Sequence, residues 1–162
     1  MLVSTVTSSA DFADLYGYLS YVISRRVPSV LRGSFGVVAW LANHWQAGFR
    51  AVLETEVSGP DRELFAERAG DVLVADATEA FQQGGRGPGH EFALLGQSRG
   101  VDLAAIEASL SLWHGSADGL VDVGVVRSAV GSLPNAGLTT VEDGHYSTLL
   151  CNCEAILRDA LG

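Results

Sequence analysis

Two short apolar segments near the C-terminus, each followed by a turn that carries a polar side chain, constrain the fold of this chain most. Leu110 to His114 alternates like a β-strand and leads through Gly-Ser-Ala to Asp118. A helix is predicted over Val123 to Leu133, and a second strand over Leu138 to Glu142 leads to Asp143-Gly144-His145. The succession of strand, helix and strand predicts a parallel arrangement with Asp118 and His145 on loops that follow successive strands.

An aspartate and a histidine placed in this way suit general-base chemistry. A carboxylate beside an imidazole fixes its tautomer and stabilises its charged form. Both residues also have a purely structural interpretation, because Asp118 lies in a good turn sequence and His145 follows a glycine. Asp122 is a rival for the acid, but it lies further from the end of the strand.

The remainder of the chain is mostly helical by periodicity. Residues 2–6 resemble a short buried strand, and apolar positions at helical spacing predict helices over 12–27, 29–49 and 60–81, the last divided at Gly70. A glycine-rich segment at 84–89 is predicted to be a flexible loop. A closing amphipathic helix is predicted over 148–161.

Length and composition limit the classes of function. The 162 residues suit one domain with a real core, and the hydrophobic content of 48% excludes a disordered chain. A formal net charge of −9 without a basic patch disfavours a nucleic-acid partner. The N-terminus does not resemble a signal peptide, and no apolar run is long enough for a membrane span, so we expect a cytoplasmic protein.

The metal and thiol candidates are weak. Cys151 and Cys153 are too close in sequence for an unstrained disulfide and too few for a zinc site, so two free thiols on a helix are expected. His44, His90 and Glu91 show no metal-ligand spacing, and His114 is expected to pack inside the fold. We therefore expect neither a metal nor a cofactor.

Residues 110–162 resemble the last two strands and helices of the α/β-hydrolase family. The resemblance is carried by an apolar strand followed by His-Gly-x-x-Asp-x-x-Val, a helix, Leu-Pro-x-Ala, a strand and Gly-His before a helix. It implies an α/β fold, namely a partial α/β-hydrolase fold with a helical cap and a short parallel sheet of about three strands. Residues 1–8 would be strand six, 9–109 the cap or lid, and 110–162 the C-terminal β-α-β-α segment of the core. Asp118 would be the triad acid and His145 the general base.

The family's nucleophile lies on a strand-to-helix turn, Gly-x-Ser-x-Gly, and this chain offers that pattern only at Gly96 to Gly100, around Ser98. Ser98 precedes Asp118 too closely to leave room for strand six and a cap, and the following residues resemble the connector to strand seven. We therefore interpret the pattern as a chance match and treat Ser98 as the weakest catalytic candidate. The oxyanion hole, which contributes about 10²–10³ in rate per donor, is expected to be missing as well.

These features imply the C-terminal part of a serine hydrolase acting on an ester, amide or related bond of a small molecule. The isolated chain is expected to be inactive, with the nucleophile supplied by a missing or separate N-terminal hydrolase half. The strand-six edge could equally pair with a second copy of the chain. The alternative is a non-catalytic, truncated pseudo-hydrolase or an interaction module.

Overall fold

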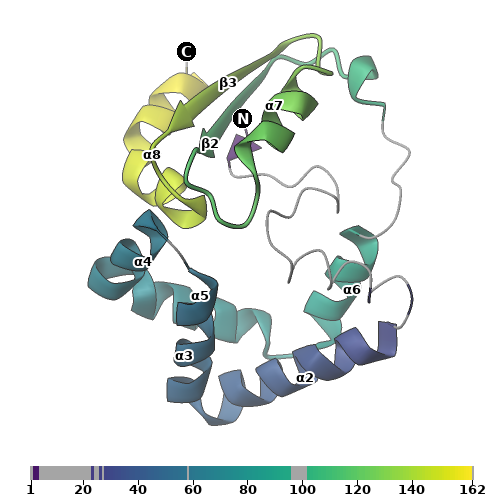
Figure 1. Cartoon of the computed structure of the whole chain (residues 1–162), viewed down its shortest axis with the longest axis vertical. Helices are drawn as coiled ribbons and strands as arrows, with labels where there is room; N and C mark the ends of the chain where they lie inside the picture. Colours follow the sequence, from purple (N-terminus) through teal and green to yellow (C-terminus); the bar gives the residue numbers. More distant parts are fainter. Residues whose placement is uncertain are drawn as a thin grey trace. The chain divides into compact units, whose positions relative to one another are not determined.

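The computed structural model describes residues 2–3, 23, 26, 28–57, 59–95 and 102–161, and Figure 1 shows their elements. The chain forms two compact units. The described residues of Met1–Asp14, Gly59–Asp61 and Arg99–Gly162 make the first unit, and those of Leu15–Ser58 and Arg62–Ser98 make the second. The first unit contains the strands and the second is helical.

The first unit is built on parallel strands. The two long strands, β2 (Leu110–Gly115) and β3 (Ala136–Val141), pair over their whole length, with Leu112 opposite Leu138. A two-residue strand, β1 (Leu2–Val3), pairs in parallel with β2, which gives the order β1-β2-β3. The predicted mixed α/β class is therefore confirmed. Strand six was predicted over residues 1–8, and most of that segment lies outside the described residues.

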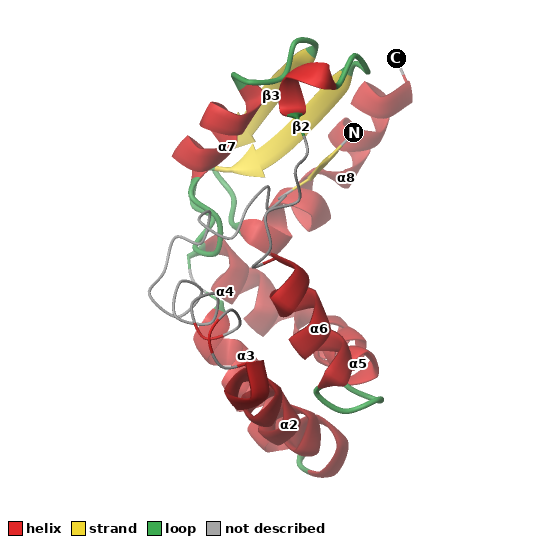
Figure 2. Ribbon diagram, turned by 90° about the vertical axis from the view of Figure 1, so that its right-hand side faces the viewer, coloured by secondary structure: helices red, strands yellow, loops and turns green. Residues whose placement is uncertain are grey.

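Two helices complete the first unit and lie on opposite faces of the sheet (Figure 2). Helix α7 (Val123–Val130) connects β2 to β3, and α8 (His145–Leu161) follows β3. A short 3₁₀ turn, η2 (Leu103–Ala105), precedes β2. The core beneath α7 is formed by Leu112, Val121 and Val126, which are almost completely buried. Burial of such side chains contributes about 1.5–3 kcal/mol each.

Polar contacts fix the far end of α8 to β2. Asp159, in the last turn of α8, accepts hydrogen bonds from the Ser111 hydroxyl and, at 3.0 Å, from the Trp113 indole N–H. These two donors lower the pKa of the Asp159 carboxyl group. The two cysteines of α8, Cys151 and Cys153, are exposed free thiols, as predicted.

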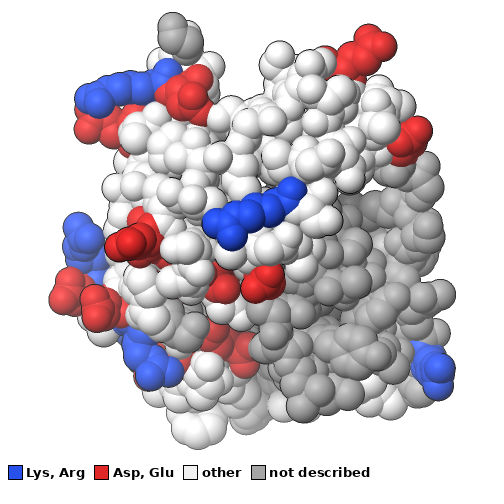
Figure 3. Space-filling model, turned by 45° about the horizontal axis from the view of Figure 1, so that its top comes forward, with Lys and Arg blue, Asp and Glu red and all other residues white. Residues whose placement is uncertain are grey.

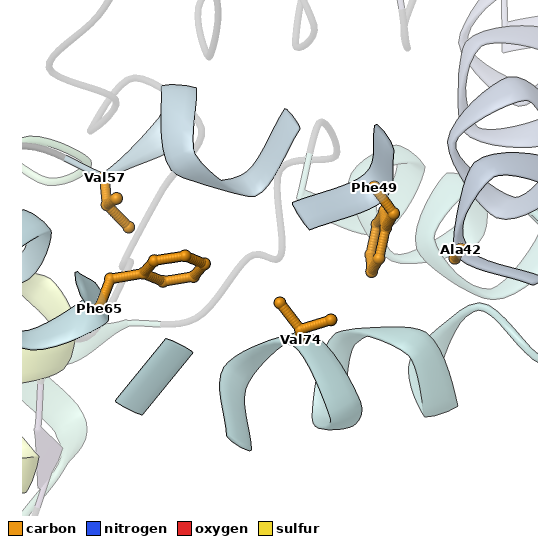
Figure 4. Packing of buried hydrophobic residues seen from close by; sticks show 5 residues of the cluster. All are labelled: Ala42, Phe49, Val57, Phe65 and Val74. Carbon is orange, nitrogen blue, oxygen red and sulfur yellow. The ribbon is translucent and has the colours of Figure 1, made fainter. Parts of the chain in front are cut away.

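The second unit consists of helices packed on a common apolar cluster. Figure 4 shows its members, Ala42, Phe49, Val57, Phe65 and Val74. Phe49 has no exposed surface. The cluster residues come from α2 (Pro28–His44), α3 (Gln46–Glu56) and the residue that follows it, the π-helical turn η1 (Phe65–Ala69) and α5 (Gly70–Ala80). Helix α4 (Pro60–Leu64) leads directly into η1, and α6 (Arg86–Leu95) packs against α2.

Two details of these helices correct the predictions, and a third prediction is not tested. The helix expected over 29–49 is interrupted at Trp45, where the backbone leaves helical geometry between α2 and α3. The loop expected at 84–89 ends early, because α6 begins at Arg86 after a turn that contains Gly84 at φ 76°. The helix expected over 12–27 lies almost entirely outside the described residues.

None of the described helices is both long enough and apolar enough to cross a membrane. On the face shown in Figure 3, charged side chains stand singly or in small groups of mixed sign. Two of the charged pairs are local to one helix, Arg50 with Glu54 and Arg158 with Glu154. Such exposed pairs at i, i+4 contribute only about 0.3–0.5 kcal/mol each.

Candidate active site

The structure brings Asp118 and His145 together at the carboxyl ends of β2 and β3. His145 Nδ1 lies 2.9 Å from Asp118 Oδ2. Asp118 ends the turn after β2, and His145 is the first residue of α8, directly after the loop that follows β3. In open α/β sheets this edge is where binding and catalytic groups collect. The sequence had placed both residues on loops after successive strands.

The two loops meet because their backbones are hydrogen-bonded to each other. The Ser116 N–H donates to the Val141 carbonyl at 2.7 Å, and the Ala117 N–H donates to the Asp143 carbonyl at 3.0 Å. Gly115 makes this approach possible, because a Cβ at that position would overlap the carbonyl oxygens of Asp143 and Gly144. The contact between Asp118 and His145 therefore follows from strand register and a glycine at the end of β2.

The Asp118 side chain is fully buried and held from both oxygens. Oδ1 accepts hydrogen bonds from the backbone N–H groups of Leu120 at 2.8 Å and Val121 at 2.9 Å, and Oδ2 faces His145. Burial raises the pKa of the carboxyl group, whereas the hydrogen bonds from His145, Val121 and Leu120 lower it. Together they hold the Asp118 pKa below its ordinary value. The site thus maintains a carboxylate of fixed orientation.

A second imidazole lies on the inner side of Asp118. His114 is completely buried, with Nε2 3.0 Å from the Val121 carbonyl oxygen and 3.6 Å from Asp118 Oδ2. A carbonyl only accepts, so the proton of the ring lies on Nε2. The other nitrogen, Nδ1, is buried and has no hydrogen-bond partner among the residues that the structure describes. His114 therefore packs inside the fold, as predicted, and forms the inner wall of the site.

His145 occupies the first turn of α8, and 21% of its side chain is exposed. The predicted start of this helix at Thr148 was wrong by three residues, because the helix begins at His145. The Tyr146 ring stands edge-on to the imidazole at a centroid separation of 5.2 Å. The Gly144 N–H donates to the Ser147 hydroxyl oxygen at 2.7 Å and closes the first turn.

Asp61 is the residue of this site that sequence reasoning missed. Its carboxylate is buried and accepts hydrogen bonds from the backbone N–H groups of His145, Tyr146 and Ser147. In sequence it is simply the residue after Pro60 at the start of a helix. The sequence contains one indirect indication that a distant residue caps α8. Gly144, which precedes this helix, has no side chain that could cap it.

The other candidate residues do not join this site. Asp122, the rival acid, is exposed and caps α7 through a 2.7 Å hydrogen bond from the Gly124 N–H. His44 is exposed and its Nδ1 lies 3.0 Å from the Trp40 carbonyl oxygen, while His90 and Glu91 are exposed on α6. Among the described residues, no group of His, Cys, Asp and Glu is arranged to hold a metal ion.

Ser98 and its Gly-x-Ser-x-Gly pattern lie outside the described residues. The residues before the pattern are described, and Arg86–Leu95 form α6. The residues directly before the pattern are therefore helical and do not form a strand. A nucleophile elbow requires a strand before the serine. This finding adds to the sequence argument that the pattern is a chance match.

The first unit thus combines a parallel α/β sheet with a buried carboxylate and a partly exposed imidazole in contact at its carboxyl edge. Comparison with known proteins finds no matching family model, no similar curated protein and no similar solved structure. The geometry of this pair is therefore the basis for a functional proposal.

Proposed function

We propose that this chain carries the acid–base part of a serine-hydrolase-type active site, in the manner of the C-terminal part of an α/β hydrolase. The observation that carries the proposal is the 2.9 Å contact between His145 Nδ1 and the buried Asp118 carboxylate. In this role His145 is the general base and Asp118 is its orienting acid. The substrate class would be a small molecule with an ester, amide or related bond.

The chemistry follows from the orientation of the imidazole. With Nδ1–H directed to Asp118, the ring is held in the tautomer whose Nε2 accepts a proton. The imidazolium formed in the reaction is stabilised by the carboxylate beside it. Nε2 can then remove a proton from an attacking hydroxyl group and later return it to the leaving group.

The nucleophile is a separate part of the proposal. Ser98 is the weaker source, and an N-terminal hydrolase half, in the same or another polypeptide, is the stronger one. The edge of the sheet offers a means of joining such a half, because β1 stands at the end of the strand order and a new strand can pair there. A second copy of the chain would compete for the same edge.

Hydrolysis of p-nitrophenyl acetate tests the proposal without requiring the nucleophile, because imidazole itself attacks this activated ester. We expect the purified chain to hydrolyse it through His145. The His145→Ala variant should fall to the background rate set by other exposed imidazoles and thiols of the chain, such as His44 and Cys151, and Asp118→Asn should fall by on the order of tenfold. His90→Ala on α6 is the matched control and should keep the wild-type rate. Wild-type turnover in His145→Ala would contradict the assignment.

A fluorophosphonate probe then locates the nucleophile. Peptide mapping after labelling distinguishes a serine of this chain, with Ser98 first, from a nucleophile supplied elsewhere. If labelling at Ser98 is lost in His145→Ala, the chain holds the whole catalytic set. If the folded chain is not labelled, the nucleophile comes from another segment. A chain with neither labelling nor His145-dependent ester hydrolysis would be the non-catalytic alternative.

A further inference from the structure

Helix α8 begins without a capping side chain of its own. The residue before its first turn is Gly144, which has no side chain to accept a hydrogen bond from the helix. The first backbone N–H groups of a helix have no partner within the helix and need one from elsewhere. Here these first groups of the helix include the N–H of His145 itself.

Asp61 supplies the missing cap from a distant part of the sequence within the same unit. Its Oδ2 accepts from the His145 N–H at 2.7 Å, and its Oδ1 accepts from the N–H groups of Tyr146 at 3.1 Å and Ser147 at 2.8 Å. The Ser147 hydroxyl accepts from the Gly144 N–H in return. The result reproduces a capping box in which Asp61 takes the place of the missing side chain at position 144.

The surroundings of Asp61 are shaped for this contact. The residue is only 5% exposed, and a Cβ on Gly144 would overlap its carboxyl group. A buried carboxylate needs hydrogen-bond donors and is stabilised by the positive end of a helix. The contacts around Asp61 therefore favour an aspartate at this position.

We propose that Asp61 is a positioning residue for His145, a role that rests on the proposed function of the Asp118–His145 pair. His145 is held at two points, its backbone N–H by Asp61 Oδ2 and its ring by Asp118 Oδ2. The first hydrogen bond fixes the position of the His145 backbone, and the second fixes the orientation of its imidazole ring. A displacement of about 1 Å at a catalytic group costs on the order of a hundredfold in rate.

The variant Asp61→Asn separates positioning from general helix capping. An asparagine keeps one carbonyl oxygen for the N–H groups of Tyr146 and Ser147, and then directs its NH₂ group at the N–H of His145. Two donors face each other there, so the bond to His145 is lost while the others persist. The matched control is Asp122→Asn, because Asp122 uses one oxygen to cap α7 and an asparagine can replace it.

Three measurements on the wild type and both variants test the proposal, at a temperature where each is folded. In Asp61→Asn we expect faster amide hydrogen exchange at His145, a weakened or shifted Nδ1–H proton resonance, and ester hydrolysis reduced by up to about tenfold, the loss expected when Asp118 itself is replaced. Asp122→Asn should match the wild type in all three. If Asp61→Asn does not fold, Asp61→Glu, which keeps the charge and moves it by one methylene, decides by the same measurements.

The two proposals fail in different ways. Wild-type exchange at His145 and an unchanged Nδ1–H resonance in Asp61→Asn would overturn the role of Asp61, whatever the ester assay shows. A change of ester hydrolysis below about twofold would do the same. A wild-type chain without His145-dependent hydrolysis would instead overturn the proposed function. The amide exchange and the Nδ1–H resonance would still report whether Asp61 holds His145.

Discussion

Asp118 determines how this fold responds to acid. Because its pKa is lowered in the folded state, the folded protein binds a proton at this carboxyl group less readily than the unfolded chain. Its contribution to stability is complete above the unfolded pKa of about 3.9 and is lost as the pH falls through the lowered folded pKa. We expect the free energy of unfolding in urea to fall more steeply below about pH 4 in the wild type than in Asp118→Asn. Equal slopes would contradict this.

His114 is fully buried and hydrogen-bonded to the Val121 carbonyl, so its replacement tests the inner wall of the site. In His114→Leu the volume is roughly kept, but the Val121 carbonyl loses its donor. We expect a loss of about 1–3 kcal/mol in the free energy of unfolding, measured by urea denaturation. His90→Leu on the exposed surface of α6 is the control, and should stay within about 0.5 kcal/mol of the wild type.

The sequence could predict that Asp118 and His145 follow successive strands and that His114 is buried, because each of these features follows from a strand pattern and its turn. It could not predict Asp61, which acts on a helix 84 residues further along the chain. The local sequence around Asp61 describes only the start of α4. Contacts between residues distant in sequence depend on how the chain returns on itself, and periodicity carries no information about that.

At the scale of elements, the junction between β3 and α8 depends on a residue without a side chain. Gly144→Ala would drive a methyl group into the Asp61 carboxyl group, and we expect a loss of about 1–3 kcal/mol in the free energy of unfolding. Gly137→Ala in β3, where a Cβ meets nothing within 4 Å, is the matched control. Thermal unfolding followed by circular dichroism measures both, and equal stabilities would contradict the close contact.

Helix α2 responds to the opposite change. Gly33 is an exposed position within α2, and a Cβ there meets nothing within 4 Å. Gly33→Ala should therefore stabilise the helix by about 0.8–1 kcal/mol, since alanine loses less backbone entropy than glycine. An increase in the midpoint of thermal unfolding checks this prediction. A decrease would mean that Gly33 has a contact that the structure does not show.

The strands and helices of residues 110–161 were predictable because each has its own periodicity and turn residues. Helix α6 was missed because its first residues, Arg86-Gly87-Pro88-Gly89, have the composition of a loop. Proline is tolerated there because the first turn of a helix leaves its N–H groups unpaired in any case. The start of α8 was missed for a related reason, since its cap comes from Asp61.

At the scale of the molecule, the described residues form two separate cores, one around Phe49 and one around Val126. Truncation of a side chain in either core should first destabilise the unit that contains it. We expect Phe49→Ala to cost about 3–5 kcal/mol and to increase amide exchange throughout α2, α3 and α5. Amides of β2 and β3 should keep their wild-type protection. Equal loss of protection in both units would show that they unfold as one.

The α/β character of the first unit was predictable from the alternation of strands and helices. Descent from α/β hydrolases stays a prediction, because the resemblance lies in one short pattern of strand, turn and helix. A helical region such as the second unit carries no motif by which a cap could be identified. The pattern of strands and turns therefore led to the Asp118–His145 pair, whereas it carries no information about the substrate.

The hydrogen bond between Trp113 and Asp159 also gives the first unit its own fluorescent reporter. The chain has three tryptophans, and two of them, Trp40 and Trp45, are more than half exposed in the second unit. Trp113 lies on β2, one residue before His114, with its indole N–H bound to α8. Indole emission depends on polarity and on nearby charge. Spectra of a Trp40→Phe, Trp45→Phe variant would therefore report separation of α8 from the sheet without an added dye.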